Sequence, residues 1–147
     1  METFYDVIIN KMRSMFESFN DEFFNSELVV PAVSISFVTD DDIEIKPDEE
    51  NRTESDYVLT LSSHSFFNTL DEIAIELLHQ MVHMYNMMHG IRDTYCRELK
   101  HNNKFASKAR EVGLIVENNK NFGFEIVDVS DQLNTYIENL RWESIKG

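Results

Sequence analysis

The fold is decided by residues 69–90, which read TLDEIAIELLHQMVHMYNMMHG. Apolar side chains recur in this stretch at intervals of three and four residues, which predicts a helix buried over most of its circumference. Thr69 and Glu72 have the spacing of a capping box, in which the hydroxyl accepts a backbone N–H and the carboxylate reaches back. Gly90 suits the left-handed conformation that closes many helices. We therefore expect a helix from about residue 69 to His89.

One stripe of this predicted helix is polar and contains two histidines. The stripe consists of Glu72, Glu76, His79, His83 and Asn86. His79 and His83 are four residues apart, so their imidazoles project from one face and could bind the same metal ion. With five histidines in 147 residues, such a pair arises by chance in roughly one sequence in eight, so the spacing alone is weak support. Imidazoles on a largely buried helix need partners, and the alternatives are a metal ion or a hydrogen-bonded pair.

A tetrahedral zinc ion needs a third protein ligand. The candidates are His64, His89, Cys96, His101 and the acidic residues. His101 is the best placed, because it opens a predicted helix over residues 101–112 that could pack against the first. His89 lies at a helix end, where the dipole favours it, and His64 follows a strand and is expected at the surface. We expect His101 to complete the site.

The rest of the chain alternates helical and strand-like patterns. The expected elements are a helix over 4–24, strands over 33–37 and 57–61, one or two short strands within 114–129, and a final helix over 130–143 with Leu133, Tyr136, Ile137 and Leu140 facing inward. The charged stretch 39–55 indicates a mobile loop or an irregular hairpin. Together these patterns predict one α+β domain over residues 1–147. Its long N-terminal helix and its histidine-bearing helix would pack on a small, mainly antiparallel sheet.

The composition restricts the setting and the partners. Thirteen Lys and Arg against 27 Asp and Glu give a net charge of −14, which opposes binding to a phosphate backbone unless the basic residues gather on one face. Cys96 is the only cysteine, so no internal disulfide can form. We find neither a secretory leader pattern nor a run of ~20 apolar residues. We expect a cytoplasmic protein with no membrane role.

Residues 76–114 contain an ordered series of motifs. The series is the histidine pair at 79 and 83, a Gly-Ile-Arg-Asp turn at 90–93, a histidine and a phenylalanine four apart at 101 and 105, and Gly-Leu at 113–114. This order resembles the SprT-like zinc metallopeptidases, and the likeness covers most of residues 15–114. The resemblance implies a zincin-like fold with one Zn²⁺ on His79, His83 and His101, and peptide-bond hydrolysis by a zinc-activated water. With a single cysteine, the chain has no C-terminal zinc ribbon of the kind found in many members.

One position departs from the family pattern. Gln80 stands where these peptidases have a glutamate that takes a proton from the zinc-bound water. An amide cannot accept that proton, so we expect zinc binding to persist and hydrolysis to be weak or absent. Glu76 and Asp93 are candidates to accept hydrogen bonds from the imidazole N–H groups. For Glu76 the alternative is a solvated helix carboxylate.

The resemblance also implies a protein or peptide substrate, and in Spartan-like members proteins crosslinked to DNA, a role that the charge of −14 does not support. In zinc peptidases the strand before the metal helix can pair with an extended substrate. Here that strand would be Tyr57, Val58, Leu59, Thr60 and Leu61.

Three alternatives for the function remain. The chain is a protease that carries a natural or engineered change at Gln80, a zinc-containing module that binds polypeptide without cutting it, or an interaction domain with a purely structural metal.

Overall fold

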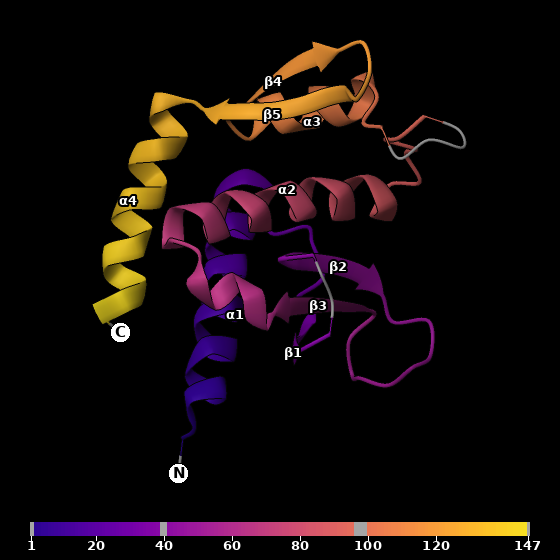
Figure 1. Cartoon of the computed structure of the whole chain (residues 1–147). Coiled ribbons are helices and arrows are strands. Elements are labelled where there is room, and N and C mark those ends of the chain that lie inside the picture. The colour runs from indigo at the N-terminus through magenta and orange to yellow at the C-terminus, as the bar shows by residue number, and fades with distance from the viewer. Residues whose placement is uncertain (1, 39–40, 96–99, 147) are drawn as a thin grey trace.

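The chain forms an α+β fold of helices around two small sheets (Figure 1). The computed structural model describes residues 2–38, 41–95 and 100–146, with backbone alone for 141–146. The elements are α1 (Phe4–Phe23), β1 (Ala32–Ser36), β2 (Ile43–Pro47), β3 (Tyr57–Ser62), the 3-10 helix η1 (Ser63–Phe67), α2 (Leu70–Met88), α3 (Asn103–Glu111), β4 (Leu114–Asn119), β5 (Gly123–Val129) and α4 (Asp131–Lys146). The α+β prediction is confirmed.

The helix α2 lies in the middle of the molecule. Figure 1 shows the three-stranded sheet on one side of it and α3 with the β4–β5 hairpin on the other. Leu77, Leu78 and Met81 of α2 are completely buried, as the apolar periodicity predicts. The Thr69 hydroxyl accepts a hydrogen bond from the Glu72 N–H at 3.2 Å, and Gly90 follows the helix with φ of +66°. Both predicted ends of this helix are therefore confirmed.

The sheet differs from the prediction of one small, mainly antiparallel sheet. The described strands form two sheets, a three-stranded one in the order β1-β3-β2 and the two-stranded β4–β5 hairpin. In the larger sheet β1 is parallel to β3, whereas β2 is antiparallel to it. The larger sheet is therefore mixed. The strand β3 is central in it, and its side chains Leu59 and Leu61 are 0% and 2% exposed.

The strand β2 lies within the charged stretch that sequence patterns assign to a mobile loop or an irregular hairpin. Ile43 and Ile45 alternate with polar residues and are 1% and 3% exposed, so two buried side chains suffice to hold this short edge strand. The following loop returns the chain to β3, and the Asp48 carboxylate binds the backbone N–H groups of Arg52 and Thr53 within it. The hairpin alternative is the one that the structure confirms.

The C-terminal third agrees with the expected elements. The predicted strand region contains β4 and β5, and in α4 Leu133, Ile137 and Leu140 are buried while Tyr136 is partly buried. Among the described residues, no helix combines the length and apolar character needed to cross a bilayer.

Candidate metal centre

Two of the predicted ligands lie on the face of α2 that looks toward α3. His79 and His83 are one helical turn apart, and each side chain is 19% exposed. Their Nε2 atoms are 3.1 Å from each other. The i, i+4 spacing therefore does bring the two rings together, as expected for side chains on one helix face.

His101 approaches from the segment before α3. The structure begins this helix at Asn103, so the prediction that His101 opens it is wrong by two residues. Asn102 is the N-cap, since its side-chain oxygen accepts hydrogen bonds from the N–H groups of Lys104 and Phe105. His101 itself is in an extended segment that bridges to Thr94 and Gly123. Its ring is set by the neighbouring strand, and only the next residue belongs to the helix cap.

The three histidines form a tight triangle of nitrogens. His101 Nε2 lies 3.4 Å from His79 Nε2 and 3.2 Å from His83 Nε2. A tetrahedral ion with metal–nitrogen bonds of about 2.0–2.1 Å separates its ligand nitrogens by about 3.3 Å. The geometry therefore fits a single metal ion equidistant from His79, His83 and His101, which are close enough to hold one.

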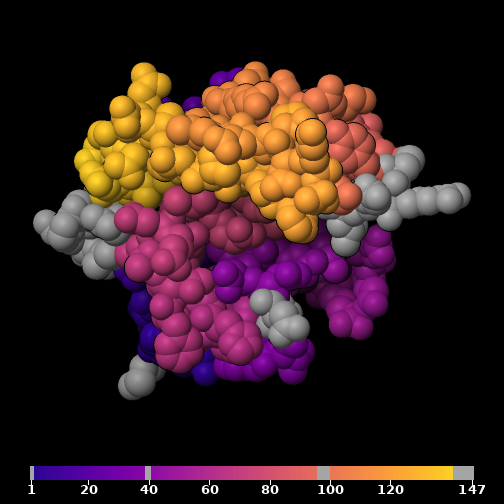
Figure 2. Space-filling view, turned by 45° about the horizontal axis from the view of Figure 1, so that its top comes forward, coloured from indigo at the N-terminus to yellow at the C-terminus, as the bar shows by residue number. Residues whose placement is uncertain are grey.

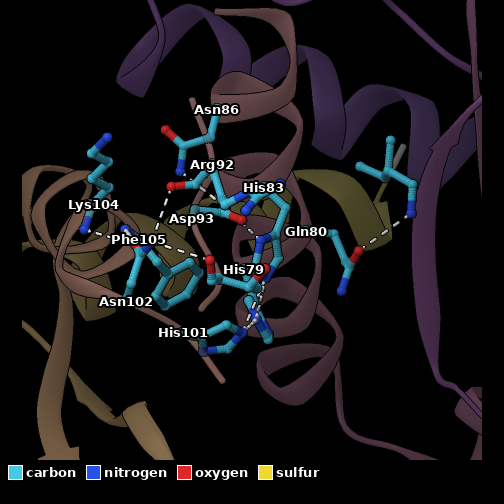
Figure 3. Close-up of polar contacts among 12 residues, drawn as sticks. His79, Gln80, His83, Asn86, Arg92, Asp93, His101, Asn102, Lys104 and Phe105 are labelled. Carbon is cyan, nitrogen blue, oxygen red and sulfur yellow. Dashed lines mark hydrogen bonds and ion pairs between the residues drawn. The ribbon is translucent and has the colours of Figure 1, made fainter. Parts of the chain in front are cut away.

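The second nitrogen of each ring faces an acceptor, as Figure 3 shows for His83 and Asp93. The Nδ1 atoms of His79, His83 and His101 lie 3.3 Å from Glu76 Oε2, 2.7 Å from Asp93 Oδ2 and 2.9 Å from the Phe124 carbonyl oxygen, respectively. Carboxylate and carbonyl oxygens only accept, so each Nδ1 is placed to donate a hydrogen bond. The Nε2 atoms are left facing one another as the nitrogens available to a metal ion. Outer hydrogen bonds of this kind orient the histidine ligands of metal sites.

The protonation of the site suits metal binding. Burial and the neighbouring His79 and His83 lower the pKa of His101 from 6.5 to about 4, so this ring is neutral near pH 7. Burial raises the pKa of Asp93, but hydrogen bonds from His83 and Asn86 outweigh burial and hold the pKa below 3.8. The carboxylate is therefore ionised where it accepts from His83.

Phe105 closes the inner side of the centre. Its ring is completely buried and is stacked on His101 with centroids 3.9 Å apart and on His83 at 4.8 Å. The His79 ring meets it edge-on at 5.4 Å. An ion among the three nitrogens is therefore walled off on this side, and any further ligand must approach from the opposite side.

The comparisons with known proteins give no assignment. No protein-family model, curated protein or solved structure matches the chain. The inference of function therefore depends on the geometry of this centre.

Gln80 does not point into the centre. Figure 3 shows its side chain extending away from the three imidazoles. Its Oε1 accepts from the Ile45 N–H at 3.3 Å, and its Nε2 donates to Glu76 Oε1 at 3.4 Å. Glu76 therefore contacts His79 and Gln80 at once, and its position beside an imidazole agrees with the prediction of an acceptor role. The amide of Gln80 joins α2 to the edge strand β2.

The other candidates lie elsewhere. His64 is exposed, and His89 is the exposed C-cap of α2, paired with Glu27 at 3.2 Å. Cys96 is outside the described residues. The structure corrects the predicted substrate strand, Tyr57–Leu61: β3 pairs with β2 over residues 57–61 and with β1 over residues 58–62. It has no free edge for a substrate, and the edge strand beside α2 is β2.

Four residues that support the centre were not predicted from the sequence to do so. The Phe124 carbonyl orients His101, and Asn86 donates to Asp93 at 3.0 Å. The Asn102 amide donates to the Arg92 carbonyl at 3.0 Å, and its backbone N–H donates to the Asp93 carbonyl at 2.9 Å. At Gly123, a Cβ atom would lie 2.7 Å from the His101 carbonyl oxygen. Asn86 stands on the polar stripe of α2, which is the only sequence hint among the four.

Asp93→Asn should weaken metal affinity by about ten- to a hundredfold, the usual cost of losing a carboxylate behind a metal-binding histidine. The amide keeps the size of the side chain but removes the charge opposite the His83 N–H. Competition with a chromophoric chelator measures the affinity. Glu27→Gln is the matched control, since Glu27 pairs with the exposed His89 in the same way and should leave the affinity unchanged. Equal affinities for Asp93→Asn and the control would contradict the role of Asp93.

Gly123→Ala should lower metal affinity by displacing His101, because the new methyl group would lie 2.7 Å from the His101 carbonyl oxygen. Gly90→Ala is the control: Gly90 also has positive φ, at +66°, but a Cβ there meets nothing within 4 Å. Both variants should lose about 1–2 kcal/mol of folding stability from left-handed strain. Only Gly123→Ala should show weaker zinc binding in the chelator competition. If both variants keep full affinity, the hairpin does not position His101.

Proposed function

We propose that this chain is a zinc-binding domain of the SprT-like metallopeptidase type, with a zincin-like fold, whose hydrolytic activity is absent or weak because Gln80 replaces the general base. The single observation that carries the metal assignment is the triangle of Nε2 atoms at 3.1, 3.2 and 3.4 Å, with every Nδ1 facing an acceptor. The ordered motifs of residues 76–114 favour the family. The charge of −14 gives no support for DNA as a partner.

Zinc is the proposed ion because three imidazoles that converge through Nε2 are a typical catalytic zinc set. A zinc ion bound there would supply Lewis-acid polarisation of a peptide carbonyl or a bound water. The residues of the chain would hold the three imidazole rings in the orientation that an ion needs. His79, His83 and His101 are each fixed through Nδ1, and Phe105 excludes water from the inner side.

The expected lack of activity follows from the carboxylates near the centre. A general base must reach the proton that it removes. Among the described residues, Glu76 contacts His79 and Asp93 contacts His83, each through the Nδ1 atom on the outer side of the ring. Gln80 has no basic oxygen, and its amide is held by Ile45 and Glu76.

The second candidate is a zinc-containing module that binds polypeptide without cutting it, and the placement of β2 favours it. Asp42 accepts from the Ser62 N–H of β3, whereas the Ile45 N–H points away from β3 to Gln80. In an antiparallel pair, successive residues point their N–H and C=O groups alternately toward and away from the partner strand, so the backbone groups of Ile43, like those of Ile45, point away from β3. An extended peptide could add to this edge. It would compete with Gln80 for the Ile45 N–H.

The test of the metal assignment is zinc stoichiometry. The purified chain, stripped with a chelator and dialysed against zinc, should hold one zinc per chain by elemental analysis. Cobalt substitution should then give the absorption of a tetrahedral nitrogen-ligated ion. A chain that retains no zinc or cobalt at equimolar concentration would rule out both candidate functions.

A further inference from the structure

Several exposed apolar residues, most of them aromatic, come from three segments of the chain that ring contacts connect. The structure places Phe4 and Tyr5 at the start of α1, Phe37 and Val38 after β1, and Phe66 and Phe67 in η1. We call these six residues the aromatic corner. In Figure 2 the magenta of η1 and early α2 lies against the purple of the first strands on the lower part of this face. Segments far apart in sequence thus form one surface.

Ring contacts connect four of these six residues. Phe4 meets Phe66 at 5.8 Å between centroids and Tyr5 at 5.7 Å, and Tyr5 meets Phe37 at 6.0 Å. Phe66 is packed against the core. In η1, the buried Ser65 hydroxyl donates to the Ser62 carbonyl at 2.6 Å. Phe4, Tyr5 and Phe37 are therefore linked through their rings to Phe66 and the core, and Val38 and Phe67 are the chain neighbours of Phe37 and Phe66.

The exposure of these side chains is large. Phe67 is 91% exposed, Val38 92%, Phe4 64% and Phe37 61%. At 150–250 Å² for each aromatic side chain, the corner leaves on the order of 600 Å² of apolar surface in water. Patches of that size are at the upper end for monomeric proteins and mark interaction sites. Rigid aromatic anchors are also the residues that contribute most to binding energy at interfaces.

The excess of negative charge near the aromatic corner favours a positively charged partner. The described parts of the three segments that contribute to it, residues 2–10, 37–38 with 41–44, and 62–72, contain seven Asp and Glu and no Lys or Arg. Asp6 lies in the first turn of α1, and Asp71 and Glu72 lie in the first turn of α2. Asp41 and Asp42 are exposed, and the Asp42 carbonyl accepts from Ser62 at the start of η1. The segments that carry the apolar surface are thus acidic, and we call these carboxylates the acidic rim.

We propose that the aromatic corner is a docking surface for a basic amphipathic segment of another protein, one whose Lys or Arg side chains flank apolar anchors. A second copy of this chain is the wrong occupant, because a symmetric contact would bring two acidic rims of chains with a charge of −14 together. An anionic membrane is repelled for the same reason. This surface is independent of the metal centre and is not part of the function proposed above.

The test uses a fluorescein-labelled amphipathic helix of Leu and Lys as the probe, with fluorescence anisotropy as the readout. The wild-type chain should bind it, and binding should weaken as salt is raised. Phe37→Ser/Phe67→Ser and Asp41→Lys/Asp42→Lys should each weaken binding by about tenfold or more. Phe122→Ser is the control, because Phe122 is exposed to the same 61% as Phe37 but lies in the β4–β5 turn. All variants change exposed side chains, so zinc content and circular dichroism should stay at wild-type values.

Several results would overturn the proposal. Equal losses for Phe122→Ser and the corner variants would mean non-specific adhesion. Undiminished binding of a Leu–Glu version of the probe would remove the role of the acidic rim. Concentration-dependent dimers that Phe37→Ser/Phe67→Ser abolishes would assign the corner to self-association, and binding to vesicles of neutral lipid that the same variant abolishes would assign it to membranes. Because zinc content is measured in parallel, none of these results bears on the metal centre.

Discussion

His83→Ala should reduce zinc affinity by about a hundredfold or more. Structural zinc sites with four ligands contribute about 10–16 kcal/mol, so one ligand corresponds to about 3 kcal/mol, which is about a hundredfold in the dissociation constant. His83 is the most strongly held of the three, with Nδ1 2.7 Å from Asp93 and its ring stacked on Phe105. The variant should retain substoichiometric zinc after dialysis against a competing chelator.

The matched controls for His83→Ala are His64→Ala and His89→Ala. Both residues are exposed and lie outside the triangle of nitrogens, so each variant should keep one zinc per chain. The same comparison tests His79→Ala and His101→Ala, which should behave as His83→Ala does. A His83→Ala chain that binds zinc as tightly as the His64→Ala chain would show that the ion, if present, is held elsewhere.

Gln80→Glu should produce or greatly increase peptide hydrolysis. A positioned general base contributes about 10²–10⁴ in rate, and the carboxylate would stand one residue after His79, where it must turn from the Ile45 N–H toward the centre to act. Glu76 complicates this variant, because it now accepts from Gln80 Nε2 and would instead face a second carboxylate one turn away. We therefore expect Glu76→Gln/Gln80→Glu to be the more active chain. Cleavage of unfolded casein, with zinc content measured in parallel, gives the comparison.

The control for the hydrolysis experiment is Gln80→Ala, which removes the amide without adding a base. It should bind zinc and remain inactive. If the Gln80→Glu chains hold full zinc but cleave no faster than Gln80→Ala, the metallopeptidase proposal is wrong, and the polypeptide-binding module becomes the better candidate. Peptide binding to β2 should then be stronger in Gln80→Ala than in the wild type, because the Ile45 N–H becomes available.

The helices and the pairing of His79 with His83 could be predicted from the sequence because they depend on local spacing. The i, i+4 pair and the capping residues around α2 act within one or two turns, and the His101 prediction followed from packing one helix on another. The sheet could not be predicted in the same way. The order β1-β3-β2 places a strand between two others that precede it in the chain, and nothing in the composition of Tyr57–Leu61 reveals how many neighbours it has.

The surroundings of the ligands were the least predictable part. The acceptor for His101 is the Phe124 carbonyl, and every residue has a carbonyl, so the residue type gives no signal. The direction of Gln80 is another example. Its contact with Ile45 depends on the position of β2. That strand was not predicted, because its two buried isoleucines, Ile43 and Ile45, lie in a stretch made up mainly of charged residues.

The attachment of His101 to the hairpin has a mechanical consequence. Two ligands belong to α2, whereas the third is bound to β5 through Phe124 and Gly123. An ion at this junction would act as a removable cross-link between the central helix and the C-terminal hairpin, closing a loop of the intervening chain. Losing the ion would therefore lower the free energy of local opening mainly in β4 and β5. The free energy of local opening of the three-stranded sheet, which contains none of the three histidines, would stay unchanged.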